Sequence, residues 1–98
     1  MKLPKRITVG KTVYAVEEVD TLRGLCGYVD YNDAEICVAR RSSYTKRAYK
    51  QEAVDDTFWH ELVHAILHEM GHKLYRDDTF VSKFANLLTK AINSAEFT

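Results

Sequence analysis

Two histidines and a glutamate in residues 60–64, which read His-Glu-Leu-Val-His, are the side chains of this sequence best suited to chemistry. On an α-helix, His60 and His64 occupy positions i and i+4 on one face, with Cβ atoms about 6 Å apart. Both imidazoles can therefore reach one zinc ion at about 2.0–2.1 Å. Glu61 is turned by about 100° around the helix axis and lies beside the metal, where a general base for a metal-activated water would act.

The residues around this motif predict a helix that buries it. Apolar side chains recur at helical spacing, and Gly71 follows as a C-terminal stop; the apolar stripe consists of Val54, Phe58, Leu62, Ala65, Ile66 and Met70. Two solvated or packed histidines on an ordinary helix are the alternative interpretation. The metal site is favoured over it, because buried histidines are costly without a binding partner.

A second match to the same pattern overlaps the first and runs from His68 to His72. Gly71 falls between its histidines at the expected helix end, so His72 would leave the helical face. His68 begins about 12 Å along the axis from His60, at about 1.5 Å rise per residue, which is too far to share one tetrahedral ion. We therefore favour residues 60–64 as the site and regard His68 as a surface or supporting residue.

A catalytic zinc site needs a third protein ligand and an open position for water. Asp77 and Asp78 precede a second amphipathic segment, where a carboxylate can face the first helix. Aspartate is also a good helix N-cap, so the two residues can divide the roles. We assign the cap to Asp77 and the metal to Asp78, with the reverse assignment and His72 as the alternatives.

The composition is that of one small globular domain over residues 1–98. Hydrophobic residues make up 46% of the chain and charged residues 29%, without a repeat or a low-complexity stretch. The first six residues lack the apolar core of a signal peptide and no segment reaches the length of a membrane span, so we expect a cytoplasmic protein with no membrane partner. Cys26 and Cys37 are expected to be reduced, packed thiols, although a hairpin turning at residues 31–32 would place them opposite each other.

The chain divides near residue 45 into strands followed by helices. Two hairpins are expected in residues 1–45, with turns at residues 10–11 and 31–33; their strands cover residues 7–9, 12–19, 27–30 and 35–39. Helical patterns cover residues 50–70 and 79–94 within the second part, 46–98. Strands first and helices second is an α+β pattern.

Residues 40–50 contain five positive charges and two tyrosines without an acidic residue. Basic residues interleaved with aromatic side chains can bind nucleic acid, so a nucleic-acid accessory protein is one alternative function. The formal net charge is zero, however, and Glu52, Asp55 and Asp56 follow directly, which would partly cancel the local field. A solvated loop is the favoured interpretation, and nucleic acid is not an expected partner.

Residues 60–67, His-Glu-Leu-Val-His-Ala-Ile-Leu, are followed by the acidic Asp78, then by Val81, Phe84-Ala85 and Leu87-Leu88. This series resembles the ImmA/IrrE-type zincin-like metallopeptidases. The chain is similar in particular to the short zincin-like proteins of bacteriophages and prophages, which open with a strand like Met-Lys-Leu-Pro-Lys at residues 1–5 and two hairpins. Asp78 stands where the family usually has glutamate, Val81 replaces the usual alanine, and the proline that often follows the leucine pair is absent.

The resemblance implies a minimal gluzincin-like fold. In such a fold a small antiparallel or mixed sheet of N-terminal hairpins packs on an active-site helix, and a C-terminal helix supplies the acidic ligand. The implied protein is a zinc-dependent metallopeptidase in a bacterial or phage-infected host cell, with one Zn²⁺ on His60, His64 and Asp78 and with Glu61 as general base. The alternatives are an inactive zincin-fold binding module with structural zinc, and a nucleic-acid or phage-assembly accessory protein that uses residues 40–50.

The expected partner is a peptide or protein substrate that binds as an added strand along an exposed sheet edge. The last strand before the helices is the candidate edge; it consists of Glu35, Ile36, Cys37, Val38 and Ala39. Tyr75 or His72, just beyond the first helix, is the candidate to stabilise the oxyanion.

Overall fold

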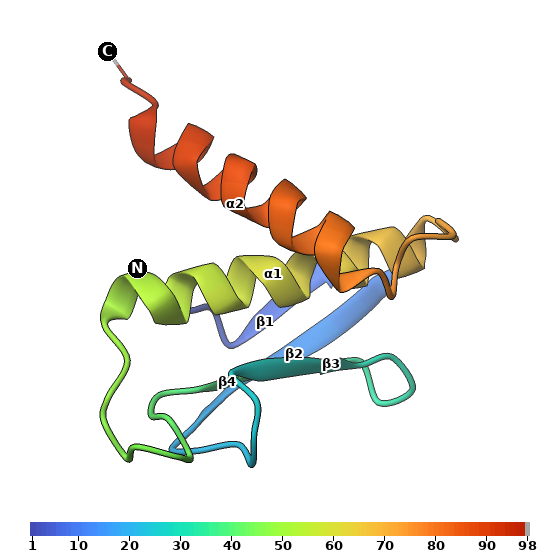
Figure 1. Ribbon diagram of the computed structural model, residues 1–98. Coiled ribbons are helices and arrows are strands. Elements are labelled where there is room, and N and C mark those ends of the chain that lie inside the picture. The colour runs from blue at the N-terminus through green and yellow to red at the C-terminus, as the bar shows by residue number, and fades with distance from the viewer. Residues whose placement is uncertain (98) are drawn as a thin grey trace.

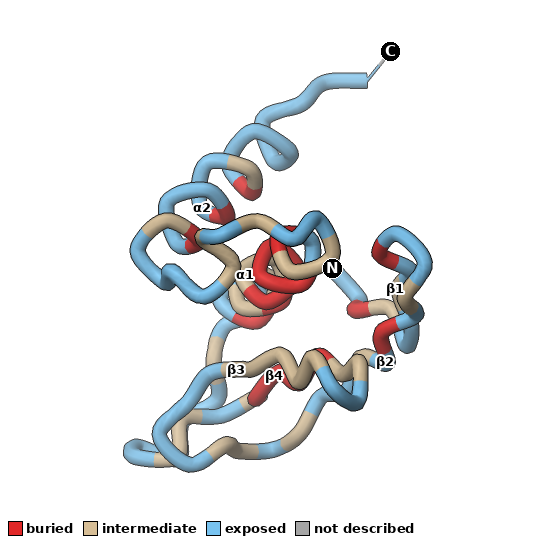
Figure 2. Tube along the Cα trace, turned by 90° about the vertical axis from the view of Figure 1, so that its right-hand side faces the viewer, coloured by how far each residue is buried: buried red, intermediate tan, exposed pale blue. Residues whose placement is uncertain are grey.

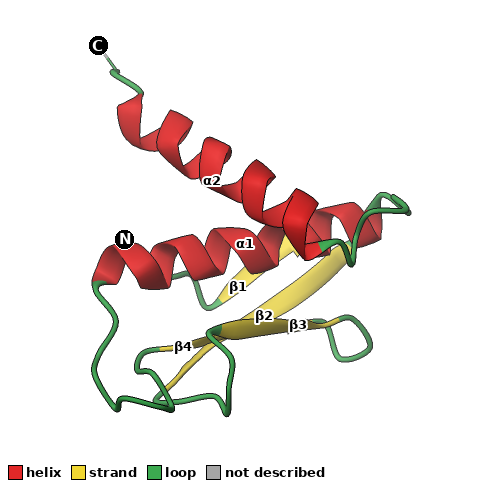
Figure 3. Ribbon diagram, viewed as in Figure 1, coloured by secondary structure: helices red, strands yellow, loops and turns green. Residues whose placement is uncertain are grey.

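The computed structural model describes residues 1–97 and has a four-stranded sheet followed by two helices (Figures 1 and 3). The elements in chain order are β1 (Arg6–Val9), β2 (Thr12–Val19), β3 (Gly27–Asp30), β4 (Glu35–Ala39), α1 (Gln51–Glu69) and α2 (Asp78–Ser94). The predicted α+β organisation is confirmed, and every element begins within one residue of its expected position.

The strands are arranged in the order β1-β2-β4-β3, so the second hairpin joins the first through its later strand. β2 and β4 are parallel, whereas β1 with β2 and β3 with β4 are antiparallel, which makes the sheet mixed. The expectation that residues 35–39 form a free edge is therefore wrong, because β4 is hydrogen-bonded to a neighbour on both sides. The free edges of the sheet belong to β1 and β3.

α1 lies between the sheet and α2, and for this reason it is apolar on two sides (Figure 1). Toward the sheet it packs Val54, Phe58, Leu62 and Ala65 against a face that includes Ile36 and Val38 of β4. Toward α2 it packs Val63 and Leu67 against Val81 and Ala85. Buried residues accordingly concentrate on α1 and on the strands that face it (Figure 2). The motif at residues 60–64 thus lies in a helix that is packed against other elements on two sides.

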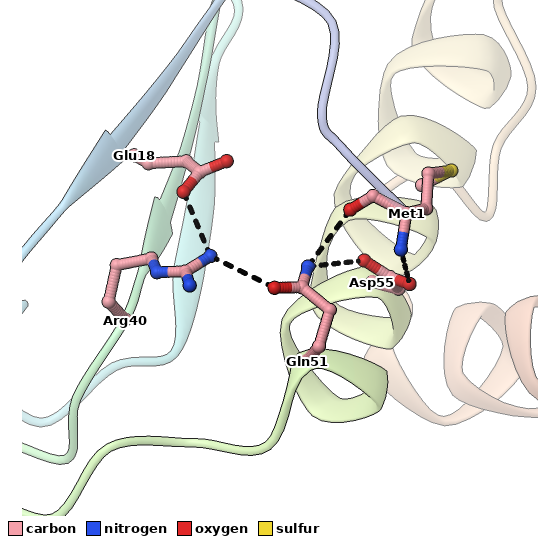
Figure 4. Close-up of polar contacts among 5 residues, drawn as sticks. All are labelled: Met1, Glu18, Arg40, Gln51 and Asp55. Carbon is pink, nitrogen blue, oxygen red and sulfur yellow. Dashed lines mark hydrogen bonds and ion pairs between the residues drawn. The ribbon is translucent and has the colours of Figure 1, made fainter.

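Polar contacts fix the N-terminal end of α1, where Lys50 makes no side-chain capping bond (Figure 4). The amide of Gln51 donates to the Met1 carbonyl and to Asp55, both at 2.9 Å, and the Met1 amine forms an ion pair with Asp55 at 2.9 Å. Arg40 donates to Gln51 at 3.4 Å and to Glu18 of β2 at 3.0 Å. The first turn of the helix is therefore connected to the sheet.

The C-terminal end of α1 is attached to the first hairpin through Glu69. Its carboxylate accepts hydrogen bonds from the Thr12 hydroxyl and, at 3.0 Å, from the hydroxyl of the fully buried Tyr14. These contacts hold the pKa of Glu69 below its usual value. With both ends of α1 attached to the sheet, the side chains at its centre have a fixed position relative to β3.

Both cysteines are free thiols, as predicted, but only Cys37 is buried and Cys26 is exposed. Tyr28, and not Cys26, lies opposite Cys37 in the register of the second hairpin. The expected opposition of the two cysteines is therefore wrong by two positions. Neither α1 nor α2 has the length and continuous apolar character that crossing a membrane requires.

Candidate metal centre

The structure brings His60 and His64 of α1 together with Asp78 at the first position of α2. The Nε2 atoms of the two histidines are 3.1 Å apart. Oδ1 of Asp78 lies 3.0 Å from Nε2 of His64 and 3.6 Å from Nε2 of His60. One ligand atom from each residue therefore converges on a single point, and the group can hold a metal ion.

The spacing of these atoms fits a tetrahedral ion. Bonds of about 2.0–2.1 Å in a tetrahedron place neighbouring ligand atoms about 3.3 Å apart, and the three observed separations lie around that value. Burial, together with the neighbouring His64, lowers the pKa of His60, which favours the neutral form that binds metals.

The orientation of His64 is set by the backbone of the loop between the helices. Its Nδ1 lies 2.6 Å from the carbonyl oxygen of Tyr75. Because a carbonyl only accepts, Nδ1 carries a proton, and Nε2 is the ring atom that faces His60 and Asp78, where its lone pair would bind a metal. A lone pair facing a carboxylate is repulsive unless a proton or cation lies between them. A hydrogen bond from the other ring nitrogen is the usual support of a metal-binding histidine.

A sharp reversal after α1 brings Asp78 to this point. Gly71 adopts φ +68°, and the His72 amide donates to the Leu67 carbonyl at 2.9 Å, which ends the helix and turns the chain back. Asp77 then caps α2 as predicted, because its side chain accepts from the Phe80 amide at 3.0 Å. The Asp78 side chain remains 82% exposed and is free to bind a metal.

The adjacent aspartates offer a matched pair of variants. Asp77→Ala is expected to lower the free energy of unfolding by about 1 kcal/mol, because one N-cap hydrogen bond is lost, and to leave the metal affinity intact. Asp78→Ala should weaken metal binding strongly and leave the metal-free protein as stable as the wild type. Chemical denaturation without metal and titration with zinc measure the two effects. If Asp77→Ala weakened zinc binding and Asp78→Ala left it intact, the metal would be assigned to Asp77.

Glu61 is buried beside the three ligand residues and is not one of them. Its exposed fraction is 8%, and burial, with a smaller contribution from the Asp78 carboxylate, raises its pKa to about 7. A carboxyl group whose pKa lies near neutrality can both accept and return a proton. A cation bound by the neighbouring residues would favour the ionised form of Glu61 and lower this pKa.

The site opens into a cleft of about 680 Å³ between α1 and β3. Gly27 of β3 lies against Thr57 and Glu61, and four residues later Tyr31 stacks on His68 with ring centroids 4.2 Å apart. β3 therefore runs alongside α1 in the same direction, and its free edge borders the cleft. A peptide could pair with that edge while it passes the three ligand residues.

Gly27 permits this close approach of strand and helix. A Cβ atom at position 27 would lie 2.7 Å from Cγ2 of Thr57 and 2.8 Å from the Cys37 carbonyl oxygen, both closer than real Cβ contacts. It would also lie 3.3 Å from Cγ of Glu61. The sequence carries no signal for this role, because Gly27 contacts residues that are distant along the chain.

Neither His72 nor Tyr75 lines the cleft as the sequence led us to expect. Nδ1 of His72 accepts from the Leu74 amide at 3.0 Å, and its ring stacks on Phe80. Tyr75 contributes its carbonyl to His64, while its ring packs against Tyr31. Both residues support the loop between the helices and do not line the cleft.

Tyr31 and Arg76 line the cleft instead, and sequence reasoning did not identify them. Burial and the nearby Glu61 raise the pKa of the Tyr31 phenol to about 12, so it remains a hydrogen-bond donor. Its hydroxyl donates to the Tyr75 carbonyl at 3.5 Å. Tyr31 occurs in a turn and Arg76 in a loop, so their spacing to residues 60–64 carries no pattern along the sequence.

No protein-family model, curated protein or solved structure matches this chain. The arrangement of its own residues therefore carries the functional argument.

Proposed function

We propose that the protein is a zinc-dependent peptidase with a minimal zincin-like fold. The observation that carries the proposal is the position of Glu61, which is buried at the wall of an open cleft and next to a three-residue ligand set that it does not join. A purely structural metal site needs ligands alone. An additional buried carboxyl beside the ligand set is the proton-accepting group that a hydrolytic reaction requires.

A bound zinc ion would act as a Lewis acid and lower the pKa of a water molecule toward 7. Glu61 then accepts a proton from the attacking water and returns it to the amine that leaves when the peptide bond breaks. His64 is held in the metal-binding tautomer by the Tyr75 carbonyl, so its Nε2 does not need to reorient.

The substrate of this reaction would be an extended peptide segment paired with β3. The free edge of β3 presents unpaired backbone groups along the cleft, and an added strand would satisfy them. β3 thus takes the role that the sequence suggested for residues 35–39. Main-chain pairing positions the substrate, and side chains along the cleft would select it.

Two hydrogen-bond donors that line the cleft would stabilise negative charge there: the Arg76 guanidinium, and the Tyr31 hydroxyl after it gives up its 3.5 Å contact with the Tyr75 carbonyl. Both are hydrogen-bond donors, and both lie on the side of the cleft where β3 ends and α2 begins. Donors aimed at the developing oxyanion are a large source of rate enhancement in acyl-group hydrolysis. In this proposal the two residues take the role that the sequence suggested for His72 and Tyr75.

Incubation with a proteome-derived peptide library, read by mass spectrometry, tests the proposal. The zinc-loaded protein should generate new peptide termini, a chelator should stop their formation, and added zinc should restore it. Protein that holds stoichiometric zinc and cleaves no peptide in the library would instead favour a binding module with structural metal.

A further inference from the structure

Two loops at one end of the sheet form a single projection, which we call the basic lobe and define as residues 20–26 and 40–50 (lower left in Figure 1). The Arg41 amide donates to the Asp20 carbonyl at 2.8 Å, and the Gly24 amide donates to the Ser43 hydroxyl at 3.0 Å. The two loops are therefore held together, although β3 and β4 separate them along the chain.

The tip of the basic lobe is organised around Ser42. Its hydroxyl accepts from the amides of Tyr44 and Thr45, both at 3.2 Å, and its carbonyl accepts from the Lys46 amide at 2.9 Å. Lys46 takes φ +62°, which closes the turn. This tip carries Tyr44 with 83% of its surface exposed, a large aromatic side chain in solvent on a hydrogen-bonded turn.

The charge of the lobe is strongly one-sided. It contains six cationic side chains and a single carboxylate, Asp20. Arg40 and Arg41 form ion pairs with Glu18 and Asp20. The remaining cations form no ion pair within the described residues; they are Arg23, Lys46, Arg47 and Lys50.

The acidic residues that follow in the sequence do not cancel this charge in the way the sequence suggested. Asp55 is paired with the Met1 amine, and Asp56 lines the metal cleft. Glu52 borders a separate hollow between α1 and α2. The lobe has its own hollow, lined by Thr21, Arg23, Gly24, Ser43, Tyr44 and Lys46.

We propose that the basic lobe binds single-stranded nucleic acid, a function separate from peptide hydrolysis. Ammonium and guanidinium groups would contact the phosphates, and Tyr44 would provide a surface on which an unpaired base stacks. Charge alone would attract any polyanion, including an acidic protein segment or an anionic membrane. The exposed ring on a fixed loop favours a ligand with aromatic bases.

Fluorescence anisotropy with a labelled oligo-dT of about 15 nucleotides tests this inference on the full chain at about 50 mM salt. We expect a dissociation constant in the micromolar range. A plot of the logarithm of the association constant against the logarithm of the salt concentration should have a slope of about −2 to −3, for three or four phosphate contacts. Absence of binding under these conditions would overturn the proposal.

Tyr44→Ala should weaken oligo-dT binding about tenfold, whereas Tyr44→Phe should retain it, because stacking needs the ring and not the hydroxyl. Phe97→Ala removes another highly exposed aromatic and should have no effect. Heparin has charge but no bases, so its affinity should not change in Tyr44→Ala. Stacking would be contradicted if Tyr44→Ala weakened heparin and oligo-dT binding equally, or if it did not change the affinity for oligo-dT. Either result would indicate a general polyanion surface.

The double variant Lys46→Gln/Arg47→Gln should weaken the binding of both ligands and reduce the magnitude of the salt slope by about 1.4. Lys83→Gln/Lys90→Gln removes the same number of charges from α2 and should change neither. Glu61→Gln and metal chelation should leave oligo-dT binding unchanged. The lobe and the proposed peptidase site can therefore fail independently.

Discussion

Zinc-loaded Glu61→Gln protein is expected to keep its metal and to lose peptide hydrolysis by at least about 100-fold. Glutamine has nearly the same shape as glutamate but cannot accept the proton of the attacking water. The structure places Glu61 outside the group of His60, His64 and Asp78, so its replacement removes no ligand. Cleavage of a peptide from the library at saturating zinc, measured as kcat/KM, gives the effect.

The fold should tolerate this substitution. Burial opposes ionisation of Glu61 and raises its pKa, so a neutral amide of similar size should not lower the free energy of unfolding. Glu52→Gln, at an exposed position on the same helix, is the matched control and should retain full activity. Equal kcat/KM for wild-type and Glu61→Gln protein would exclude Glu61 as the base.

Gly27→Ala is the second substitution with a large expected effect, because it adds one methyl group where β3 lies against α1. The new Cβ would meet Cγ2 of Thr57 and the carbonyl oxygen of Cys37 at less than 3 Å, so the Thr57 side chain must move and β3 must shift against β4. Overpacking of this kind costs about 1–3 kcal/mol of stability. It should also displace Glu61 and the free edge of β3, so hydrolysis should fall more than stability alone explains.

Two further variants distinguish the steric clash at position 27 from a general effect of replacing glycine. Gly10→Ala strains a positive φ in an open turn, so it should reduce stability by about 1–2 kcal/mol and leave activity intact. Adding Thr57→Ala to Gly27→Ala removes the Cγ2 contact and should recover part of the stability, while the Cys37 carbonyl contact remains. Activity of Gly27→Ala equal to that of Gly10→Ala would contradict the proposed role of the β3 edge.

Features that depend on neighbours along the chain were predictable from the sequence. The hairpin turns, both helices and the i, i+4 relation of His60 and His64 are local properties, and the structure contains them. The cap by Asp77 was also accessible, because capping geometry orients this residue toward the helix backbone and leaves the side chain of Asp78 free to lie beside the two histidines.

Features that depend on how distant segments meet were not predictable. The central position of β4 in the sheet follows from its parallel pairing with β2. The connection at residues 20–26 makes this pairing possible, and nothing in the sequence of the hairpin specifies the pairing. The roles of Tyr31 and Gly27 arise from contacts with α1, more than 25 residues away. Tyr75 acts through its backbone carbonyl, which every residue type possesses.

Zinc stoichiometry tests the central claim most directly. The experiment compares wild-type protein with the variants His60→Ala and His68→Ala. Each protein is equilibrated with buffered zinc and separated from free metal, and the amount of zinc per chain is then measured. Wild-type protein and His68→Ala should each hold one ion, and His60→Ala should bind zinc more weakly by over about 100-fold while it retains its helical content. Stoichiometric zinc in folded His60→Ala, at the affinity of the wild type, would contradict the assignment of the metal centre.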